Sequence, residues 1–221
     1  MASAMLDCVL FDLDGLLVDS EPLQFRAYQY AFDQFGIRLG MEDWINWHSA
    51  EASTARWVEA QQLDLDVEQL RNVKKAYYDE LIATDLDLKP GIRSLVDDCA
   101  ASYRLAVVSA SRRESIEACL DKFGLTAHFS ILVSGGEVAR SKPFPDSYIA
   151  AMQALQTSPS GAIALEDSLT GYRAATAAGL KCIVCPDHFI PKPEGAFADA
   201  THVTRSLQYL SATQLRDIHA Q

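Results

Sequence analysis

The sequence predicts an α/β fold: a Rossmann-like core in which helices cover both faces of a parallel sheet, with a helical domain inserted after the first strand. Short, β-rich apolar runs recur along the chain, with helix-like segments between the later ones. These runs are apolar at nearly every position, which is typical of parallel strands buried on both faces. A long, mostly helical stretch separates the first two runs. The expected strands are Leu6–Phe11, Leu105–Val108, Ile131–Val133, Ala162–Leu165 and Cys182–Val184.

The long stretch after the first strand predicts the inserted domain. Its first helix begins near Asp19–Ser20 with Pro22 in the opening turn, and Gly36 ends it. Proline and glycine at residues 90–91 mark the return to the core. We expect further helices over Ser53–Gln62, Val67–Ala83 and Ile92–Ser102, a short strand at His202–Val203 and a last helix from Ser211. The expected boundaries are 1–18 and 88–221 for the core and 19–87 for the inserted domain.

The composition is that of an ordinary globular protein, with 49% hydrophobic and 22% charged residues. No window approaches the run of about 18 apolar residues that a membrane span needs. The apolar run Leu6–Phe11 has no basic segment before it and no small-residue cleavage site after it. We therefore expect a soluble, cytoplasmic protein without a membrane partner, acting as a monomer.

The five cysteines are odd in number and mostly lie in apolar surroundings, which favours reduced thiols. Cys182 and Cys185 have the spacing of half a zinc site. They lie in an expected strand, however, where positions three apart face opposite ways, and no second pair exists. We expect no zinc site.

A formal net charge of −11 argues against a nucleic-acid partner, because binding a phosphate backbone needs a basic stripe. The acidity is concentrated in one part of the chain. Residues 19–87 contain 14 acidic and six basic residues, a net charge of −8.

Polar residues follow four of the expected strands. In open parallel sheets, ligands bind beyond the carboxyl ends of the strands, so these positions are the candidate site. They form one coherent set that can bind a cation and a phosphate. The set is Asp12 and Asp14 after the first strand, Ser109 and Ser111 after the second, Lys142 after the third, and Glu166 and Asp167 after the fourth.

Asp12 and Asp14 are two residues apart, a spacing that can bring two carboxylates together, and Gly15 permits a turn after them. Paired carboxylates repel each other unless they share a cation. With Asp167 as a third oxygen ligand, a hard divalent ion would offset that repulsion, and Mg²⁺ is the usual ion beside a phosphate. One carboxylate can then attack phosphorus while the other protonates the leaving oxygen.

Each of these features alone has an ordinary structural explanation. An isolated Asp-x-Asp is usually a turn or a cap, and an isolated Ser is usually a helix N-cap. The combination is more specific, because four separate strand ends supply the required residue types in order.

Four segments together resemble the haloacid dehalogenase superfamily, in the branch that contains β-phosphoglucomutase and the sugar phosphatases. The resemblance spans nearly the whole chain and is weakest over residues 40–87. The segments are Phe11–Glu21, Val108–Ser111, Ser141–Asp146 and Leu165–Gly171.

The resemblance implies a role for each motif residue. Asp12 is expected to be the nucleophile, and Asp14 the general acid and base, with its backbone carbonyl on Mg²⁺. Glu166 and Asp167 are expected to serve the metal. The expected phosphate-binding residues are Ser109, Ala110, Arg113 and Lys142, and the inserted domain is expected to be a mobile cap that closes over a small phosphorylated metabolite.

Asp14 argues against the dehalogenases that name the superfamily. These resemble the chain at Asp12 but lack an acid two residues later, because a halide leaving group needs no proton. Phosphonate hydrolysis is disfavoured as well, since that branch uses a cap lysine with no counterpart here.

Two enzymatic activities and one non-enzymatic role stay open. Mutases of this branch hold a second phosphate with a basic residue in the first cap loop, which corresponds here to Asn46–Arg56. That stretch offers only His48 and Arg56 as cations, with Glu51 between them. Since the acidic insert would also repel a bisphosphate, we favour hydrolysis of a sugar phosphate over mutase action. The non-enzymatic alternative is a phosphometabolite-binding regulator, although no catalytic position is replaced.

The aromatic residues of the insert have two interpretations. Trp44 and Trp47 could stack on a sugar face, or they could pack the core of the inserted domain. Trp47 and His48 are the candidate cap contacts to substrate.

Overall fold

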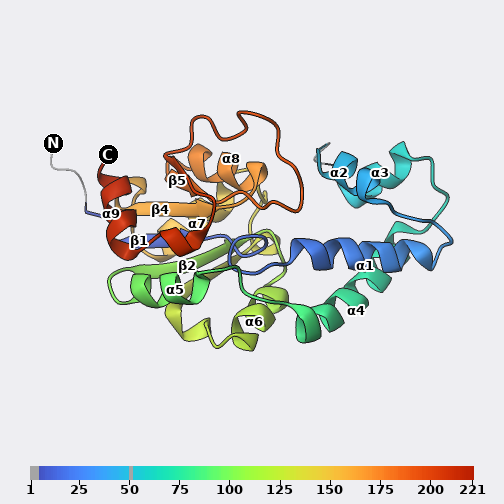
Figure 1. Cartoon of the computed structure of the whole chain (residues 1–221), viewed down its shortest axis with the longest axis horizontal. Coiled ribbons are helices and arrows are strands. Elements are labelled where there is room, and N and C mark those ends of the chain that lie inside the picture. The colour runs from blue at the N-terminus through green and yellow to red at the C-terminus, as the bar shows by residue number, and fades with distance from the viewer. Residues whose placement is uncertain (1–4, 50–51) are drawn as a thin grey trace. The chain divides into compact units, whose positions relative to one another are not determined.

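The computed structural model describes residues 5–49 and 52–221 (Figure 1). The chain divides into two compact units. The larger unit contains the chain up to Asp19, Asp87–Asp187 and Glu194–Gln221, and the smaller contains Ser20–Leu86 and His188–Pro193.

Within the described residues, six strands form one parallel sheet in the order β3-β2-β1-β4-β5-β6. The predicted α/β fold with a parallel sheet is confirmed, and every predicted strand is present with its ends shifted by at most two residues. The bounds are β1 Cys8–Phe11, β2 Arg104–Ser109, β3 Phe129–Ser134, β4 Ala162–Glu166, β5 Lys181–Val184 and β6 His202–Val203.

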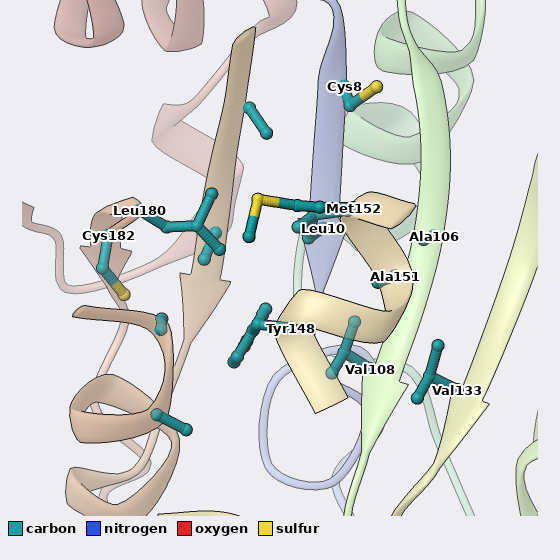
Figure 2. Close-up of a cluster of buried hydrophobic side chains, with 14 of the residues drawn as sticks. Cys8, Leu10, Ala106, Val108, Val133, Tyr148, Ala151, Met152, Leu180 and Cys182 are labelled. Carbon is teal, nitrogen blue, oxygen red and sulfur yellow. The ribbon is translucent and has the colours of Figure 1, made fainter. Parts of the chain in front are cut away.

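Helices cover both faces of the sheet. Helices α7 (Asp146–Ala154) and α8 (Leu169–Ala177) pack on the face formed by Leu10, Val108 and their neighbours (Figure 2). Side chains on that face alternate with a second buried set, which includes Val9 and Val107. The remaining helices of this unit are α5 Ile92–Ala100, α6 Arg113–Lys122 and α9 Ala212–Ala220, of which α5 contacts β2 and α6 contacts β3.

The strand order places the ends of three strands side by side. The chain runs from β1 to β2 and β3 on one side, then crosses to β4 on the other side of β1. Leu10 therefore pairs with Ala106 of β2 and with Ala164 of β4. Because all strands are parallel, the residues that follow β1, β2 and β4 meet at one edge, where the strand order reverses.

The smaller unit has its own hydrophobic core. Its helices are α1 Glu21–Asp33, α2 Met41–Ser49, α3 Thr54–Ala60 and α4 Val67–Asp85. Trp44 and Trp47 are buried among other aromatic rings, and Trp47 stacks on Trp57 with ring centroids 5.0 Å apart. The interpretation that these tryptophans pack the insert's core is the one that the structure supports.

Two features of this unit differ from the expectations. The stretch from Asn46, treated as a loop, begins inside α2, since Asn46–Ser49 form the end of that helix. Residues His188–Pro193, expected in the core, belong to the helical unit. Ile190 lies in the same hydrophobic cluster, and the Phe189 ring lies 6.0 Å from that of Phe25.

Among the helices of the described residues, none combines the length and the apolar character needed to cross a bilayer.

Candidate active site

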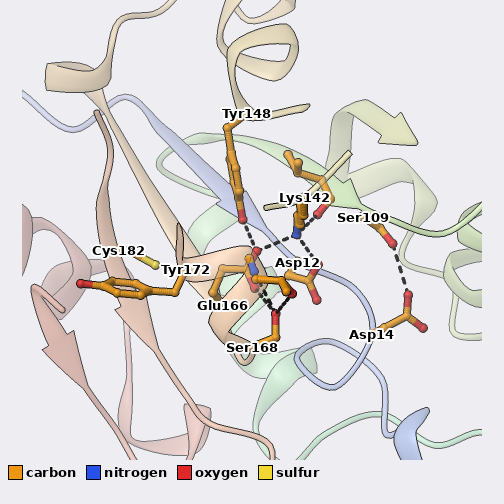
Figure 3. A network of polar contacts seen from close by, with 12 residues as sticks. Asp12, Asp14, Ser109, Lys142, Tyr148, Glu166, Ser168, Tyr172 and Cys182 are labelled. Carbon is orange, nitrogen blue, oxygen red and sulfur yellow. Dashed lines mark hydrogen bonds and ion pairs between the residues drawn. The ribbon is translucent and has the colours of Figure 1, made fainter. Parts of the chain in front are cut away.

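Asp12 lies directly after β1, and its side chain is buried at the centre of a polar network (Figure 3). Its backbone N–H donates to Leu165 O at 3.0 Å, which extends the pairing of β1 with β4. Its Oδ1 accepts a hydrogen bond from Lys142 Nζ at 2.5 Å. The sheet therefore fixes the backbone of Asp12, and Lys142 fixes its carboxylate.

The Lys142 ammonium group has all three of its N–H donors directed at protein acceptors. Besides Asp12 Oδ1, it donates to Val108 O at 2.8 Å and to Glu166 Oε1 at 2.6 Å. The Lys142 side chain is 5% exposed, so these ion pairs are little screened by water. Lys142 thus joins the ends of three neighbouring strands.

Burial and charge act against each other at this pair. The pKa of Asp12 is raised to about 8: burial raises it most, the charge of Lys142 lowers it, and the charges of Glu166 and Asp14 raise it. Burial disfavours the charged form of Lys142, but Asp12 and Glu166 outweigh burial and raise the pKa of Lys142 above its usual value. The site holds a lysinium and more carboxylates than that one cation can neutralise.

Three buried carboxyl groups form a cluster that can hold a metal ion. One oxygen from each of Asp12, Glu166 and Asp167 lies within 4.8 Å of the others. When all three are ionised beside Lys142, two negative charges are unbalanced, which is the charge of one divalent cation. An all-oxygen donor set suits a hard cation. The prediction of Asp12, Glu166 and Asp167 as a shared metal site fits this geometry.

Two glycines leave room for these carboxylates. A Cβ at Gly15, whose φ is +80°, would lie 2.4 Å from Asp167 Oδ2. A Cβ at Gly171 would lie 2.0 Å from Glu166 Oε2. Both glycines belong to the sequence motifs, and the close approach explains why side chains are excluded there.

Asp14 points away from this cluster, toward the end of β2 (Figure 3). Its Oδ2 accepts hydrogen bonds from Ser109 Oγ at 3.2 Å and Ser111 Oγ at 2.7 Å. Ser109 Oγ in turn accepts the Ser111 N–H at 2.9 Å. The carboxylate of Asp14 lies outside the metal-binding group of three, so only its backbone carbonyl stays a predicted metal ligand.

Sequence reasoning missed several polar groups that support the site. Tyr148 of α7 donates its hydroxyl to Glu166 Oε1 at 2.5 Å, and Ser168 Oγ lies 3.4 Å from Glu166 Oε2. Ser111 follows a predicted strand, and the sequence alone predicts no role for it, although its hydroxyl donates to Asp14 Oδ2. Tyr148 lies two residues after Asp146 at the start of α7. This position becomes meaningful only once α7 is known to pack on β2 and β3 and to bring the tyrosine hydroxyl to Glu166.

Comparisons with known proteins identify the family of this chain. The sequence model of the haloacid dehalogenase-like hydrolase family matches residues 9–185. The protein CbbY of Cereibacter sphaeroides is 35% identical over 208 residues, which cover 88% of this chain and 90% of CbbY. The chain belongs to the haloacid dehalogenase-like hydrolases. The predicted superfamily and enzyme class are confirmed.

Two further similarities place the chain within this family. The crystal structure of CbbY from Rhodobacter sphaeroides in complex with phosphate has a TM-score of 0.86 and 32% identity, covering 96% of this chain and all of CbbY. A phosphorylated carbohydrates phosphatase of Thermotoga maritima is 27% identical, with 80% of this chain and 84% of that protein aligned. The chain thus lies in the sugar phosphatase branch of the haloacid dehalogenase-like hydrolases.

The guanidinium of Arg113 is engaged away from the acid cluster. It is the first residue of α6, and its guanidinium donates to both carboxylate oxygens of Glu137, at 2.8 and 2.6 Å, and to Leu132 O at 2.7 Å. The phosphate contact of Arg113 stays a prediction, and in this structure Glu137 engages the bidentate donors of its guanidinium. Ala110, in contrast, lies between Ser109 and Ser111, at the edge where its backbone amide was expected to act.

The candidate contacts of the insert are engaged within the smaller unit. Trp47 is 5% exposed and donates its indole N–H to Ala52 O at 2.8 Å. His48 Nδ1 lies 3.0 Å from Trp44 O, and burial lowers the pKa of His48 below its usual value. His48 is therefore neutral near pH 7 and is a poor anion ligand. Glu51 lies outside the described residues.

Proposed function

We propose that this chain is a Mg²⁺-dependent phosphatase that hydrolyses a sugar phosphate through a covalent aspartyl-phosphate on Asp12. The observation that carries the proposal is the position of the Asp12 carboxylate, which is buried, fixed by Lys142 and grouped with Glu166 and Asp167. A buried carboxylate held beside a lysinium and a cation site is suited to attack on a negatively charged phosphoryl group.

The reaction proceeds in two displacements. An oxygen of Asp12 forms a bond to phosphorus as the ester P–O bond breaks, and the leaving oxygen takes a proton from Asp14. A water molecule then attacks phosphorus, gives its proton back to Asp14 and releases the Asp12 carboxylate with inorganic phosphate. Lys142 and the amides that follow Ser109 stabilise the charge on the phosphoryl oxygens.

Asp12, Asp167 and Glu166 would hold the Mg²⁺ ion, with the backbone carbonyl of Asp14 as a further ligand. When bound, the cation reduces the repulsion between the Asp12 carboxylate and the phosphoryl oxygens. Since burial raises the pKa of Asp12 to about 8 without a cation, binding one also favours the ionised nucleophile.

The relatives support a sugar phosphate as substrate. A mutant of CbbY from Rhodobacter sphaeroides, with 32% identity and a TM-score of 0.84 over 93% of this chain and 96% of that one, was crystallised with xylulose 1,5-bisphosphate. A relative that binds a bisphosphate weakens the argument from the acidity of the insert, because net charge does not describe the surface that meets the ligand. We therefore include pentulose bisphosphates among the candidate substrates.

Mutase action is the second candidate. Structures called putative β-phosphoglucomutase and β-phosphoglucomutase are 21% identical to this chain, which supports the fold alone. Burial disfavours a charged His48, one of the two cations considered for a second phosphate. Hydrolysis is therefore the preferred activity, with residues 19–87 proposed as the cap that closes over the substrate.

A phosphate-release screen tests the proposal. Purified protein is assayed with sugar monophosphates and pentulose bisphosphates, with Mg²⁺ or with a chelator, and Asp12→Asn is the control. We expect Mg²⁺-dependent release from at least one sugar phosphate and none above background from Asp12→Asn. Interconversion of sugar 1- and 6-phosphates without net release would support the mutase instead.

A further inference from the structure

Tyr148 is a fully buried tyrosine whose hydroxyl and ring both contact the charged network. It is the third residue of α7, and no part of its side chain reaches solvent. Its hydroxyl donates to Glu166 Oε1 at 2.5 Å (Figure 3). The Lys142 ammonium lies 5.1 Å from the centroid of its ring. One side chain therefore contacts both members of the Lys142–Glu166 ion pair.

The hydroxyl of Tyr148 acts as a hydrogen-bond donor to Glu166 in this arrangement. A phenol is protonated at neutral pH, and the neighbouring carboxylate can only accept. Glu166 Oε1 thus accepts from both Tyr148 and Lys142, while Glu166 Oε2 lies 3.4 Å from Ser168 Oγ. These donors fix the orientation of a carboxylate that has no solvent contact.

The acceptors of Lys142 differ in how firmly they are held. Val108 O belongs to β2, and Glu166 Oε1 is fixed by Tyr148. The third acceptor, Asp12 Oδ1, belongs to the proposed nucleophile. The carboxylate of Asp12 becomes an acyl phosphate when it bonds to phosphorus. The N–H directed at Asp12 is consequently the one that can pass to a phosphoryl oxygen while the other two stay in place.

We propose that Tyr148 is a positioning residue that orients Glu166 so that the Lys142 ammonium keeps one donor for the phosphoryl group. This inference rests on the proposed function. Tyr148 itself touches neither phosphate nor metal. Its ring adds a favourable contact to the lysinium, and its hydroxyl provides the fixed geometry.

The chain offers a matched control for the test. Tyr148→Phe keeps the ring and removes only the hydroxyl. Tyr172→Phe makes the same chemical change in the same hydrophobic cluster, and the Tyr172 hydroxyl points away from Glu166 (Figure 3). Inorganic phosphate, the product, serves as the probe in calorimetric titrations with Mg²⁺ present, alongside kcat on the best substrate.

We expect Tyr148→Phe to lower kcat about tenfold and to weaken phosphate binding severalfold, whereas Tyr172→Phe changes neither. In a Lys142→Met background, Tyr148→Phe should have no further effect on phosphate affinity, because the group that it positions is gone. Wild-type kcat and phosphate affinity in Tyr148→Phe would overturn the inference. Equal losses with and without Lys142 would also overturn it, because they would show a merely structural role.

Failure of the proposed function gives a different result. If the wild-type protein releases no phosphate from any sugar phosphate, the proposed function fails. If it is active and Tyr148→Phe is equally active, only the role of Tyr148 fails.

Discussion

The Lys142 ammonium lies 2.5 Å from Asp12 Oδ1, and both side chains are almost completely shielded from solvent. The lysine comes from the segment before α7 and the aspartate from the end of β1, so the fold brings together residues far apart in the chain. The pair combines the proposed nucleophile with the cation proposed to stabilise the phosphoryl group, and the predictions below follow from it and from its surroundings.

Removing the Lys142 ammonium should abolish most activity. Lys142→Met keeps a similar stem and loses the charge that we propose neutralises the phosphoryl oxygens. We expect kcat to fall by about 10²- to 10³-fold, the usual effect of losing one such group. Steady-state phosphate release measures this, and Lys75→Met, at an exposed ion pair with Asp79, is the control that should keep wild-type activity. A fall of less than threefold in Lys142→Met would contradict the assigned role.

The affinity for Mg²⁺ should rise with pH. Below a pKa of about 8, Asp12 holds a proton that the cation must displace, so each pH unit lost should weaken apparent binding by roughly tenfold. The activation constant for Mg²⁺, measured from initial rates at pH 6, 7, 8 and 9, should decrease up to pH 8 and level off above it. The increase in Tm caused by Mg²⁺ should follow the same order. An activation constant independent of pH would show that Asp12 does not compete with protons for the metal.

Lys89 should stabilise the larger unit by neutralising Asp187. Its Nζ lies 2.7 Å from Asp187 Oδ2 and 3.1 Å from Asp19 Oδ1, and the Asp187 side chain is 1% exposed. Lys89→Met removes the cation beside a buried carboxylate, so we expect a loss of about 3 kcal/mol in the free energy of unfolding. Denaturant unfolding measures the loss. Lys75→Met, at the exposed pair, should change stability by less than about 1 kcal/mol. Equal stability of the two variants would refute this role for Lys89.

Gly171 should be intolerant of any side chain. Because its Cβ would lie 2.0 Å from Glu166 Oε2, Gly171→Ala should displace Glu166 and weaken both Mg²⁺ activation and kcat, by about tenfold or more. Gly136→Ala is the control, since its Cβ would meet only Ser134 Oγ, at an ordinary 3.7 Å. Full activity in Gly171→Ala would mean that the position of Glu166 is not critical.

The sheet and the acid cluster could be predicted from sequence because each depends on local patterns. Uniformly apolar runs indicated the strands, and polar residues after them indicated the site edge. Asp12 and Asp167 follow their strands directly, whereas Lys142 comes from the segment between β3 and α7. The parallel arrangement then required these residues to meet.

The remaining features depend on tertiary packing. Helix α2 was overlooked, although Gly40 N–H donates to Asp43 Oδ2 in a local capping contact at its start. The segment His188–Pro193 joins the helical unit through Phe189 and Ile190, which no local pattern indicates. The partner of Arg113 is Glu137, an acid whose position depends on the end of β3.

The central claim is that Asp12 becomes phosphorylated. The most direct measurement is to quench the reaction with acid during turnover, reduce the acyl phosphate with borohydride and map the peptide that contains Asp12 by mass spectrometry. We predict homoserine at position 12 only when substrate and Mg²⁺ are both present. Rapid phosphate release without modification at Asp12, or undiminished release by Asp12→Asn, would contradict the claim.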